Sequence, residues 1–331
     1  MTPRERVLGA LRRQPVRPLP VGAVTQSATV FQMEATQAFW PEAHRDAAQM
    51  ARLAAAAHTL VGFDFVRVPF DQTVEAELLG AEVNLGDRIS NCSIRSHPLR
   101  LGDPLPPAPD LDSGRAKVVV EAIALLQKEF GQEIALLGGL VGPFTLICQL
   151  AGSTAVLMQG TRRPDALRPY LDFAVELGIE YGRRQVAAGA DVITVEDMSA
   201  SLDLTSPHLY QQLILPAQQQ LLAAIPAPTI LHVCGSNTRI LHLLHQAGAE
   251  ALSLEDRTDL VQAVSAGDCA VIGGVPTVDV LLNGTPDDVR RACEESLAAG
   301  VHILAPGCGL PPLSARQNLE EMVRAARRWG C

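Results

Sequence analysis

The sequence contains no uninterrupted run of the roughly 18 or more uncharged apolar residues that a membrane-spanning helix needs. Its N-terminus, MTPRERVLGALRRQP, also lacks the apolar centre of a secretory signal. These two absences predict a protein that neither spans a membrane nor is exported. The cytoplasm is the compartment that we expect.

Positive charge is also scarce. The 331 residues include 27 Lys and Arg against 36 Asp and Glu, which gives a formal net charge of -9, and the basic residues form no stripe. We therefore expect no nucleic-acid partner, because such a partner needs a basic surface. The chain contains no low-complexity tract, and its 47% hydrophobic content can fill a large core. We expect residues 1–331 to form one domain.

Cysteine is present without the pattern of a disulfide framework. Seven cysteines, an odd number, stand at irregular spacing: Cys92, Cys148, Cys234, Cys269, Cys293, Cys308 and Cys331. In a reducing compartment such residues are expected to be thiols or metal ligands.

A repeated unit dominates the second half of the chain. From about residue 185 an Ala-rich helical end, a Gly and a short β-rich run recur in AAGADVITVED, QAGAEALSLED, SAGDCAVIGGV and AAGVHILAPGC. Each Gly stands where a helix ends and a buried strand begins. Strands that alternate with helices predict right-handed crossovers and a parallel sheet.

Together with PTILHVC and three earlier segments, at 19–25, 63–70 and 134–143, these runs give eight strands. Helices are expected at 114–129, 165–187, 208–224, 238–246, 287–299 and 314–328. The fold class is therefore α/β, a single (β/α)₈ barrel.

Two segments lie outside the repeating pattern. The N-terminal TPRE predicts a helix that is capped by Thr2 and Glu5 and that plugs or flanks the barrel. Residues 71–112 fit neither a helix nor a strand of the barrel, and we expect a long insertion over its mouth.

Candidate site residues stand at the carboxyl ends of the predicted strands, where barrel enzymes carry their catalytic groups. In TILHVCGSN, His232 and Cys234 are two apart on a strand and point to the same side. Cys308 in APGCG follows the eighth strand. One His and two Cys suit Zn²⁺, and three ligands with one open position are typical of catalytic zinc. The alternative is that these thiols are buried as small hydrophobic groups.

Several longer segments carry a resemblance to a known family. The quoted stretches are VTQSATVFQMEATQAFWPEAH, VGFDFVRVPFDQTVEAELLGAEVNLG, GPFTL, DMSASLDLTSPHLY, LHVCGSNTRIL and LAPGCGLPP. Together they resemble the uroporphyrinogen decarboxylase superfamily, and within it the methylcobamide:coenzyme M methyltransferases of the MtaA/CmuA type. HVCG with PGCG is specific to the zinc-dependent transferases. The arginine-rich motif that decarboxylases use has no counterpart in residues 15–40, which disfavours uroporphyrinogen decarboxylation.

The resemblance implies that His232, Cys234 and Cys308 hold Zn²⁺ and form the catalytic centre. It also implies that the thiol of an acceptor, coenzyme M above all, takes the fourth position and receives the methyl group of a methylated corrinoid. Metal coordination deprotonates a thiol, and the thiolate is the nucleophile. Nothing in the chain resembles a cobalamin-binding module, so a separate carrier protein is expected to bring the methylcobamide and to dock transiently at the barrel mouth.

Other residues near strand ends have open roles. The candidates for the open zinc position without substrate are Asp197, Glu255 and Glu75, although hydrogen-bonded strand-end carboxylates fit as well. The sulfonate of coenzyme M needs a cation or N–H donors. Arg67, Arg239 and Arg257 are the candidates, and each fits a surface ion pair equally.

Glycine turns and the remaining histidines complete the set of candidates. Gly274 in GGVPTVD and the turn GCGLPP permit close approach of the corrinoid or of a partner's backbone, as do ordinary barrel turns. His44, His58 and His97 have no partner at ligand spacing and are expected to be packing or surface residues.

Three other functions remain open at this point. The first keeps the corrinoid and replaces the acceptor by homocysteine or tetrahydrofolate. The second is a decarboxylase of a tetrapyrrole or a related acid, for which zinc is irrelevant. The third is a zinc- or corrinoid-binding protein without catalytic activity.

Overall fold

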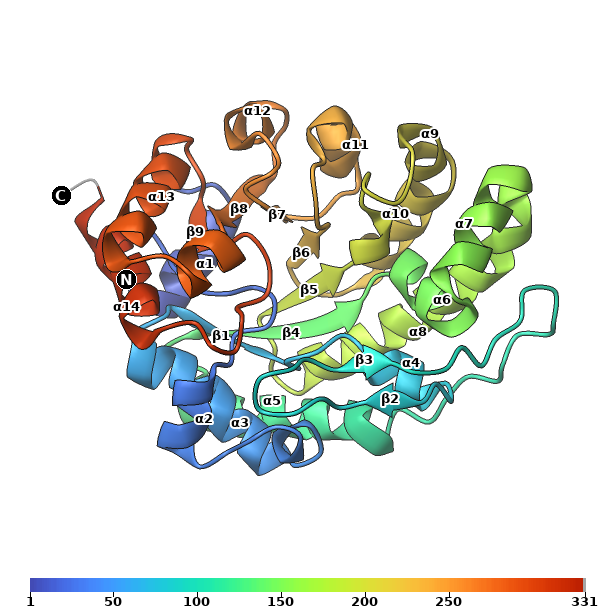
Figure 1. The fold of residues 1–331 in the computed structure, drawn as a ribbon, viewed down its shortest axis with the longest axis horizontal. Helices are drawn as coiled ribbons and strands as arrows, with labels where there is room; N and C mark the ends of the chain where they lie inside the picture. The colour runs from blue at the N-terminus through green and yellow to red at the C-terminus, as the bar shows by residue number, and fades with distance from the viewer. Residues whose placement is uncertain (330–331) are drawn as a thin grey trace.

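A parallel sheet of seven buried strands forms the centre of the molecule in the computed structural model, which describes residues 1–329 (Figure 1). The strands are β1 (Phe65–Val68), β4 (Ala135–Val141), β5 (Val192–Glu196), β6 (Thr229–His232), β7 (Ala251–Leu254), β8 (Ala270–Val275) and β9 (Ile303–Pro306). They pair in this order, and all are buried along their full length. Seven of the eight predicted strands are therefore present.

The predicted strand at 19–25 is reduced to a single bridging residue. Val21 pairs in parallel with Leu304 of β9, whose N–H donates to the Pro20 carbonyl at 2.9 Å. On the other side the Asp64 N–H donates to the Val21 carbonyl at 2.8 Å, next to β1. Pro20 has no N–H to extend a ladder, which explains why the strand is so short. The segment still links β9 to β1, and the fold is the predicted (β/α)₈ barrel.

Helices surround the sheet (Figure 1). The larger ones are α2 (Val30–Thr36), α3 (Ala47–Ala56), α5 (Gly114–Phe130), α6 (Pro143–Ala151), α7 (Ser153–Arg162), α8 (Arg168–Ala187), α10 (Leu215–Ala224), α11 (Leu241–Gln246), α12 (Leu260–Ser265), α13 (Pro286–Ala298) and α14 (Arg316–Arg328). The predicted helices at 114–129, 165–187, 287–299 and 314–328 match α5, α8, α13 and α14 within a few residues. Among the described residues no helix is long and apolar enough to cross a membrane.

Two predicted helices are less regular than expected. The predicted helix at 208–224 consists of α9 (Pro207–Leu209), a π-helical turn over Tyr210–Ile214 and then α10. Pro216 lies just after this turn and supplies no backbone donor, which disturbs regular helical hydrogen bonding there. The predicted helix at 238–246 begins with a 3₁₀ turn before α11.

The N-terminal helix α1 (Pro3–Leu11) closes one end of the barrel. Its capping box is present: the Glu5 N–H donates to Thr2 Oγ1 at 3.1 Å, and the Thr2 N–H donates to Glu5 Oε2 at 2.9 Å. The buried side chains Val7, Ala10 and Leu11 pack against side chains from inside the barrel. These come from all seven strands: Phe65, Ala135, Leu137, Val192, Ile230, Ala251, Ala270, Ile272, Ile303 and Ala305. The helix therefore plugs the amino-terminal end of the strands.

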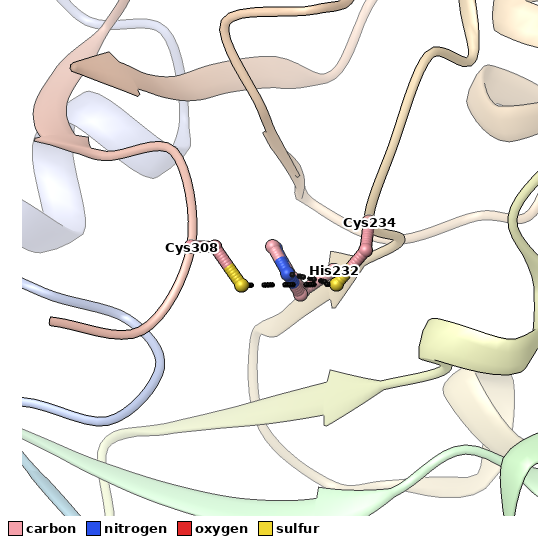
Figure 2. Close-up of side chains that lie close together, drawn as sticks. All are labelled: His232, Cys234 and Cys308. Carbon is pink, nitrogen blue, oxygen red and sulfur yellow. Dashed lines mark hydrogen bonds between the residues drawn. The ribbon is translucent and has the colours of Figure 1, made fainter. Parts of the chain in front are cut away.

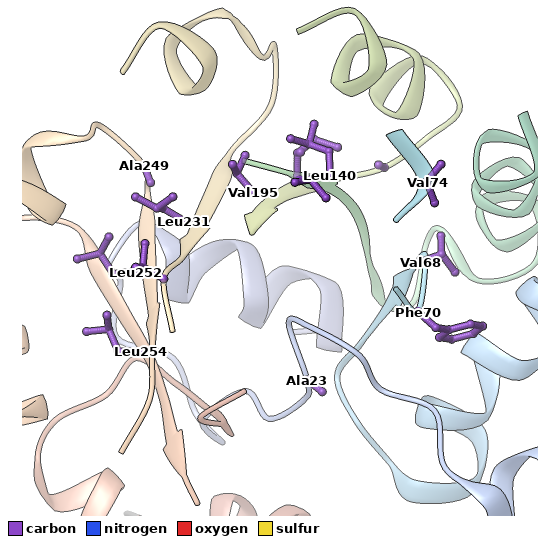
Figure 3. Close-up of a cluster of buried hydrophobic side chains, with 14 of the residues drawn as sticks. Ala23, Val68, Phe70, Val74, Leu140, Val195, Leu231, Ala249, Leu252 and Leu254 are labelled. Carbon is purple, nitrogen blue, oxygen red and sulfur yellow. The ribbon is translucent and has the colours of Figure 1, made fainter. Parts of the chain in front are cut away.

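A second core fills the space between the sheet and the helices (Figure 3). Strand side chains alternate between the two faces, so Leu231 lies in this outer core while Ile230 lies inside the barrel. The same alternation directs His232 into the barrel, toward its carboxyl end.

The insertion at 71–112 divides into two parts. Its first part holds α4 (Val74–Leu78) and a hairpin of β2 (Val83–Asn84) and β3 (Ser93–Ile94), and residues 91–94 lie at the barrel mouth. The second part leaves the mouth, and its residues 106–111 border a groove beside α8. The hairpin therefore forms part of the wall of the barrel mouth.

Candidate metal centre and the cavity beside it

Three side chains meet at the carboxyl end of the barrel (Figure 2). His232 ends β6, Cys234 follows it, and Cys308 comes from the loop after β9, 74 residues further along the chain. His232 Nε2 lies 3.2 Å from Cys234 Sγ, which lies 3.8 Å from Cys308 Sγ. One ligand atom of each residue lies within 4.8 Å of the others. We call this group the His-Cys-Cys cluster.

Neighbouring residues fix the cluster in this orientation. His232 is paired across the sheet with Ser253, and the two side chains are 3.0 Å apart at His232 Nδ1 and Ser253 Oγ. This contact leaves Nε2 facing the thiols, as in metal-ligating histidines whose second nitrogen is held by a neighbour. Buried Asn237 donates from Nδ2 to the Cys234 carbonyl at 2.7 Å and so fixes the turn after the strand.

The charges of the cluster favour one thiolate. Hydrogen bonds from Cys234 and then from His232 lower the pKa of Cys308 to about 4, against the opposing effect of burial. The same contact with Cys308 raises the pKa of Cys234. One nitrogen and two sulfur donors converge here, with His232 buried and both cysteines half-buried. This donor set fits Zn²⁺.

Glu255 lies beside the cluster, just after β7. It is half-buried, and burial raises its pKa while the Gly235 N–H lowers it. The charges of Cys308 and His232 also act on this carboxyl. Glu255 therefore lies within electrostatic reach of the cluster.

Asp197 faces the opposite way. Its Oδ1 accepts from the N–H and the hydroxyl of Thr145, both at 2.8 Å, and its Oδ2 accepts from Gln218 Nε2 at 2.9 Å. These contacts join β5 to α6 and α10. Both oxygens are used in helix packing, and the structure does not bring Asp197 to the cluster.

Gly274 also lies away from the cluster. A Cβ at this position would approach Leu260 Cδ1 to 2.8 Å, so the residue faces α12 on the outside of the barrel. The absence of a side chain here permits close packing of α12 on β8.

Glu75 is buried in α4, where its Oε1 accepts from the Val141 N–H at 2.8 Å. Burial raises the pKa of Glu75 to about 7. A raised carboxyl pKa lowers stability as the pH rises from about 4.5 to 7, because the unfolded chain ionises more readily. The unfolding free energy of Glu75→Gln minus that of the wild type is expected to increase by about 2 kcal/mol when the pH rises from about 5 to 8, as measured by urea unfolding. A stability difference that does not change with pH would contradict the raised pKa of the buried Glu75 carboxyl.

A cavity of about 330 Å³ adjoins the His-Cys-Cys cluster, and we call it the mouth cavity. Barrel, loop and hairpin residues line it: Thr25, Gln26, Arg67, Phe70, Asp71, Gln72, Thr73, Asn91, Cys92, Ser93, Ile94, Gln149, Met198, Cys308 and Gly309. Cys308 is thus the member of the cluster that borders open space.

The three candidate arginines differ in position. Arg67, in β1, lines the mouth cavity and is 1% exposed. Arg257 is exposed and pairs with Asp203 at 2.7 Å, and Arg239 is exposed. Only Arg67 of these three borders the cavity.

Glu196 was not singled out from the sequence, although its neighbour Asp197 was. Glu196 ends β5, is paired across the sheet with His232 and accepts hydrogen bonds from Arg67 and Gln72. Alternation along β5 from Val192, which lies inside the barrel, places Glu196 inside. Counting faces along the strand could therefore have found this residue.

The prediction that His44 has no partner at ligand spacing is wrong, because His44, Asp71 and Cys92 offer ligand atoms within 4.8 Å of one another. His44 Nδ1 lies 3.4 Å from Asp71 Oδ2, and its Nε2 lies 3.6 Å from Cys92 Sγ. Asp71 already accepts from Thr73 and from Arg115, and burial lowers the pKa of His44. The contacts of this group anchor the hairpin to the barrel wall.

Comparison with known proteins shows similarity over the full chain. Residues 2–329 match the family model described as uroporphyrinogen decarboxylase (URO-D). The methylcobamide:CoM methyltransferase MtbA of Methanosarcina mazei is 39% identical over 336 residues, 99% of this chain and 98% of that protein. MtaA of Methanosarcina barkeri, a methylcobamide:CoM methyltransferase, is 34% identical over 98% of this chain and 97% of its own. A solved methyltransferase structure from Methanosarcina mazei aligns with a TM-score of 0.95 at 34% identity over 100% of both chains.

Proposed function

Because the chain belongs to the uroporphyrinogen decarboxylase family, and within it to the methylcobamide:coenzyme M methyltransferases, we propose that it transfers the methyl group of a methylated corrinoid to coenzyme M. The observation that carries this proposal is the convergence of His232, Cys234 and Cys308 beside the mouth cavity. A decarboxylase has no need of such a soft donor set, whereas the zinc that it suits can activate a thiol.

His232, Cys234 and Cys308 are the residues that would hold Zn²⁺. Zinc bound there supplies the positive charge that keeps an acceptor thiol in its nucleophilic thiolate form at neutral pH. Ser253 holds the imidazole so that Nε2 faces the thiols. Two cysteine thiolates would balance the charge of the ion, and Glu255, which is electrostatically coupled to Cys308 and His232, is the proposed occupant of the fourth position without substrate.

The walls of the mouth cavity bind the acceptor and limit its contact with water. Cys308 lies on one wall, and residues 91–94 of the hairpin form another. An acceptor that enters this space loses much of its hydration, which strengthens its electrostatic contacts with the protein. Hairpin residues therefore position the thiol and exclude solvent.

We further propose that a corrinoid carrier protein docks over the barrel mouth. Large apolar side chains, each more than half exposed, lie on the insertion and on segments that follow barrel strands: Ile89, Leu204, Val261 of α12, Val278 of a helical turn after β8, and Leu313. Isolated exposed apolar residues need no explanation, but a set on segments that follow the carboxyl ends of the strands fits a transient protein interface.

The carrier surface is tested by the double variant Leu204→Asp and Leu313→Asp. We expect its kcat/KM with the carrier to fall at least about 5-fold more than its kcat/KM with free methylcob(III)alamin, since interface anchors contribute more than about 1 kcal/mol. Leu125→Asp, on the exposed face of α5, is the control. Equal losses with both methyl donors would contradict docking at these loops.

The free thiols support a reducing compartment such as the cytoplasm. All six cysteines of the described residues are free, and burial raises the pKa of Cys148 and Cys293 to about 12. Disulfides persist mainly in oxidising compartments. The cysteine pattern therefore suits an intracellular enzyme.

The function is tested by mixing the zinc-loaded protein anaerobically with methylcob(III)alamin and 2-mercaptoethanesulfonate. We expect loss of the methyl-cobalt absorbance and formation of the methyl thioether, with slower turnover for homocysteine and none for tetrahydrofolate. Tetrahydrofolate carries a nitrogen acceptor that does not need thiolate activation. Failure with every acceptor, both with free methylcob(III)alamin and with a methylated carrier, would contradict the proposal.

A further inference from the structure

A buried guanidinium shares the mouth cavity with the thiol side of the site. Arg67 and Cys308 both line this space, and Arg67 is the only Lys, Arg or His among the described residues that line it. The one carboxylate in the same lining, Asp71, is neutralised by Arg115, 2.7 Å away. Arg67 is therefore the one cation in this part of the described lining, and its own counter-ion is the buried Glu196.

Arg67 has more donors than its protein partners use. It donates to the Pro69 carbonyl and to Glu196, while its buried Nε has no hydrogen-bond partner. A guanidinium carries five N–H donors in a fixed plane. The Nε faces Gly139 of β4, but each terminal nitrogen carries two N–H groups and makes one of these bonds, so donors remain on a residue that lines the cavity. Donors of a planar guanidinium match the oxygens of an acidic group.

Glu196 is the competing anion. Its second oxygen accepts from Gln72, and the carboxylate lies beside Arg67 with no exposed surface. An entering anion must share Arg67 with this carboxylate. Removing the Glu196 charge is therefore expected to strengthen the binding of an anion.

We propose that Arg67 binds the acidic end of the methyl acceptor and selects thiols that carry a sulfonate or a carboxylate. This inference rests on the proposed function, because it assigns the second end of the same acceptor. A buried anion needs a charged partner, since leaving it unpaired is strongly unfavourable. A neutral thiol gains nothing from Arg67.

The selectivity of methyl transfer is the first test. With free methylcob(III)alamin, kcat/KM is measured for 2-mercaptoethanesulfonate, 3-mercaptopropionate and neutral 2-mercaptoethanol. We expect Arg67→Gln to lower the ratio of acidic to neutral thiol by about 10- to 100-fold, the value of a charged hydrogen bond. Arg239→Gln, an exposed control, leaves the ratio unchanged. A ratio that stays constant in Arg67→Gln would overturn the proposal, because a merely structural role lowers all three rates together.

The charge-sharing argument gives a second, opposite variant. Glu196→Gln keeps the shape of the side chain and removes its charge. We expect this variant to increase the ratio of acidic to neutral thiol by about 3- to 10-fold. If Arg67→Gln does not fold, as judged by circular dichroism, Arg67→Lys replaces it, with an expected loss of about 3- to 10-fold because Lys lacks the planar fork. A decrease in Glu196→Gln would count against competition for Arg67.

Binding without chemistry separates this inference from the proposed function. Ethanesulfonate has the acidic end and no thiol, so calorimetric titration of the metal-free protein reports on Arg67 alone. We expect affinity to fall at least about 10-fold in Arg67→Gln and to rise in Glu196→Gln. Should the wild type methylate no thiol, the proposed function fails while this titration still decides the anion site. Equal affinity in the wild type and Arg67→Gln would overturn the site itself.

Discussion

His232→Ala and Cys308→Ser are each expected to lose more than about 100-fold in zinc affinity, since even residues that only orient metal ligands contribute 10- to 100-fold. Each change removes one of the three converging donors and leaves too few to hold the ion. We expect thiol-dependent loss of the methyl-cobalt absorbance to disappear with the metal. Zinc content after dialysis and the rate with 2-mercaptoethanesulfonate are the two measurements.

A matched control is available at another half-buried thiol. Cys269 lies 2.9 Å from His245 Nδ1, so Cys269→Ser keeps a hydrogen-bonding group in a similar His contact away from the cluster. Its zinc content and rate should equal those of the wild type. Full zinc content in Cys308→Ser would show that the ion is held elsewhere. An equal loss of zinc in Cys269→Ser would show that the effect of Cys308→Ser is not specific to the His-Cys-Cys cluster.

The second large expected effect is on stability. Asp64→Ala is expected to lower the unfolding free energy by about 3 to 5 kcal/mol, because it leaves the buried Arg6 guanidinium without its counter-charge. Asp64 accepts from Arg6 at 2.5 Å, from Arg327 at 2.8 Å and from the Val21 N–H at 2.9 Å. One carboxylate thus joins α1, α14 and the segment that closes the sheet.

Urea unfolding measures this effect. Asp268→Ala is the control, because Asp268 is fully exposed and its contact with Arg13 spans 3.6 Å. An exposed pair contributes about 0 to 1 kcal/mol. A loss in Asp64→Ala no larger than that of the control would contradict the view that this carboxylate closes the barrel.

The barrel and the ligand cluster could be predicted because their signals are local. The Gly between each helix and strand repeats in sequence, and the 232/234 spacing on a strand fixes a common side for His and Cys. Convergence with Cys308 followed from the rule that strand ends share one face of a barrel. The structure brings these three residues together as that rule implies.

Other features depended on backbone chemistry or on distant partners. The first strand is short because Pro20 breaks the ladder, although its apolar pattern indicated a full strand. Asp197 follows a strand end, yet its side chain faces α6 because the chain alternates faces there. His44 meets Asp71 and Cys92 only through the folded insertion. The helix α6, which begins at Pro143 after Gly142, was not among the helices predicted from the sequence.

The central claim is that the acceptor thiol binds to zinc held by His232, Cys234 and Cys308. Zinc K-edge X-ray absorption of the zinc-loaded protein, recorded before and after addition of 2-mercaptoethanesulfonate, tests it most directly. The account predicts two sulfur donors from the protein and one additional sulfur when the thiol is present. A sulfur count that stays the same under conditions in which the thiol is methylated would contradict the claim.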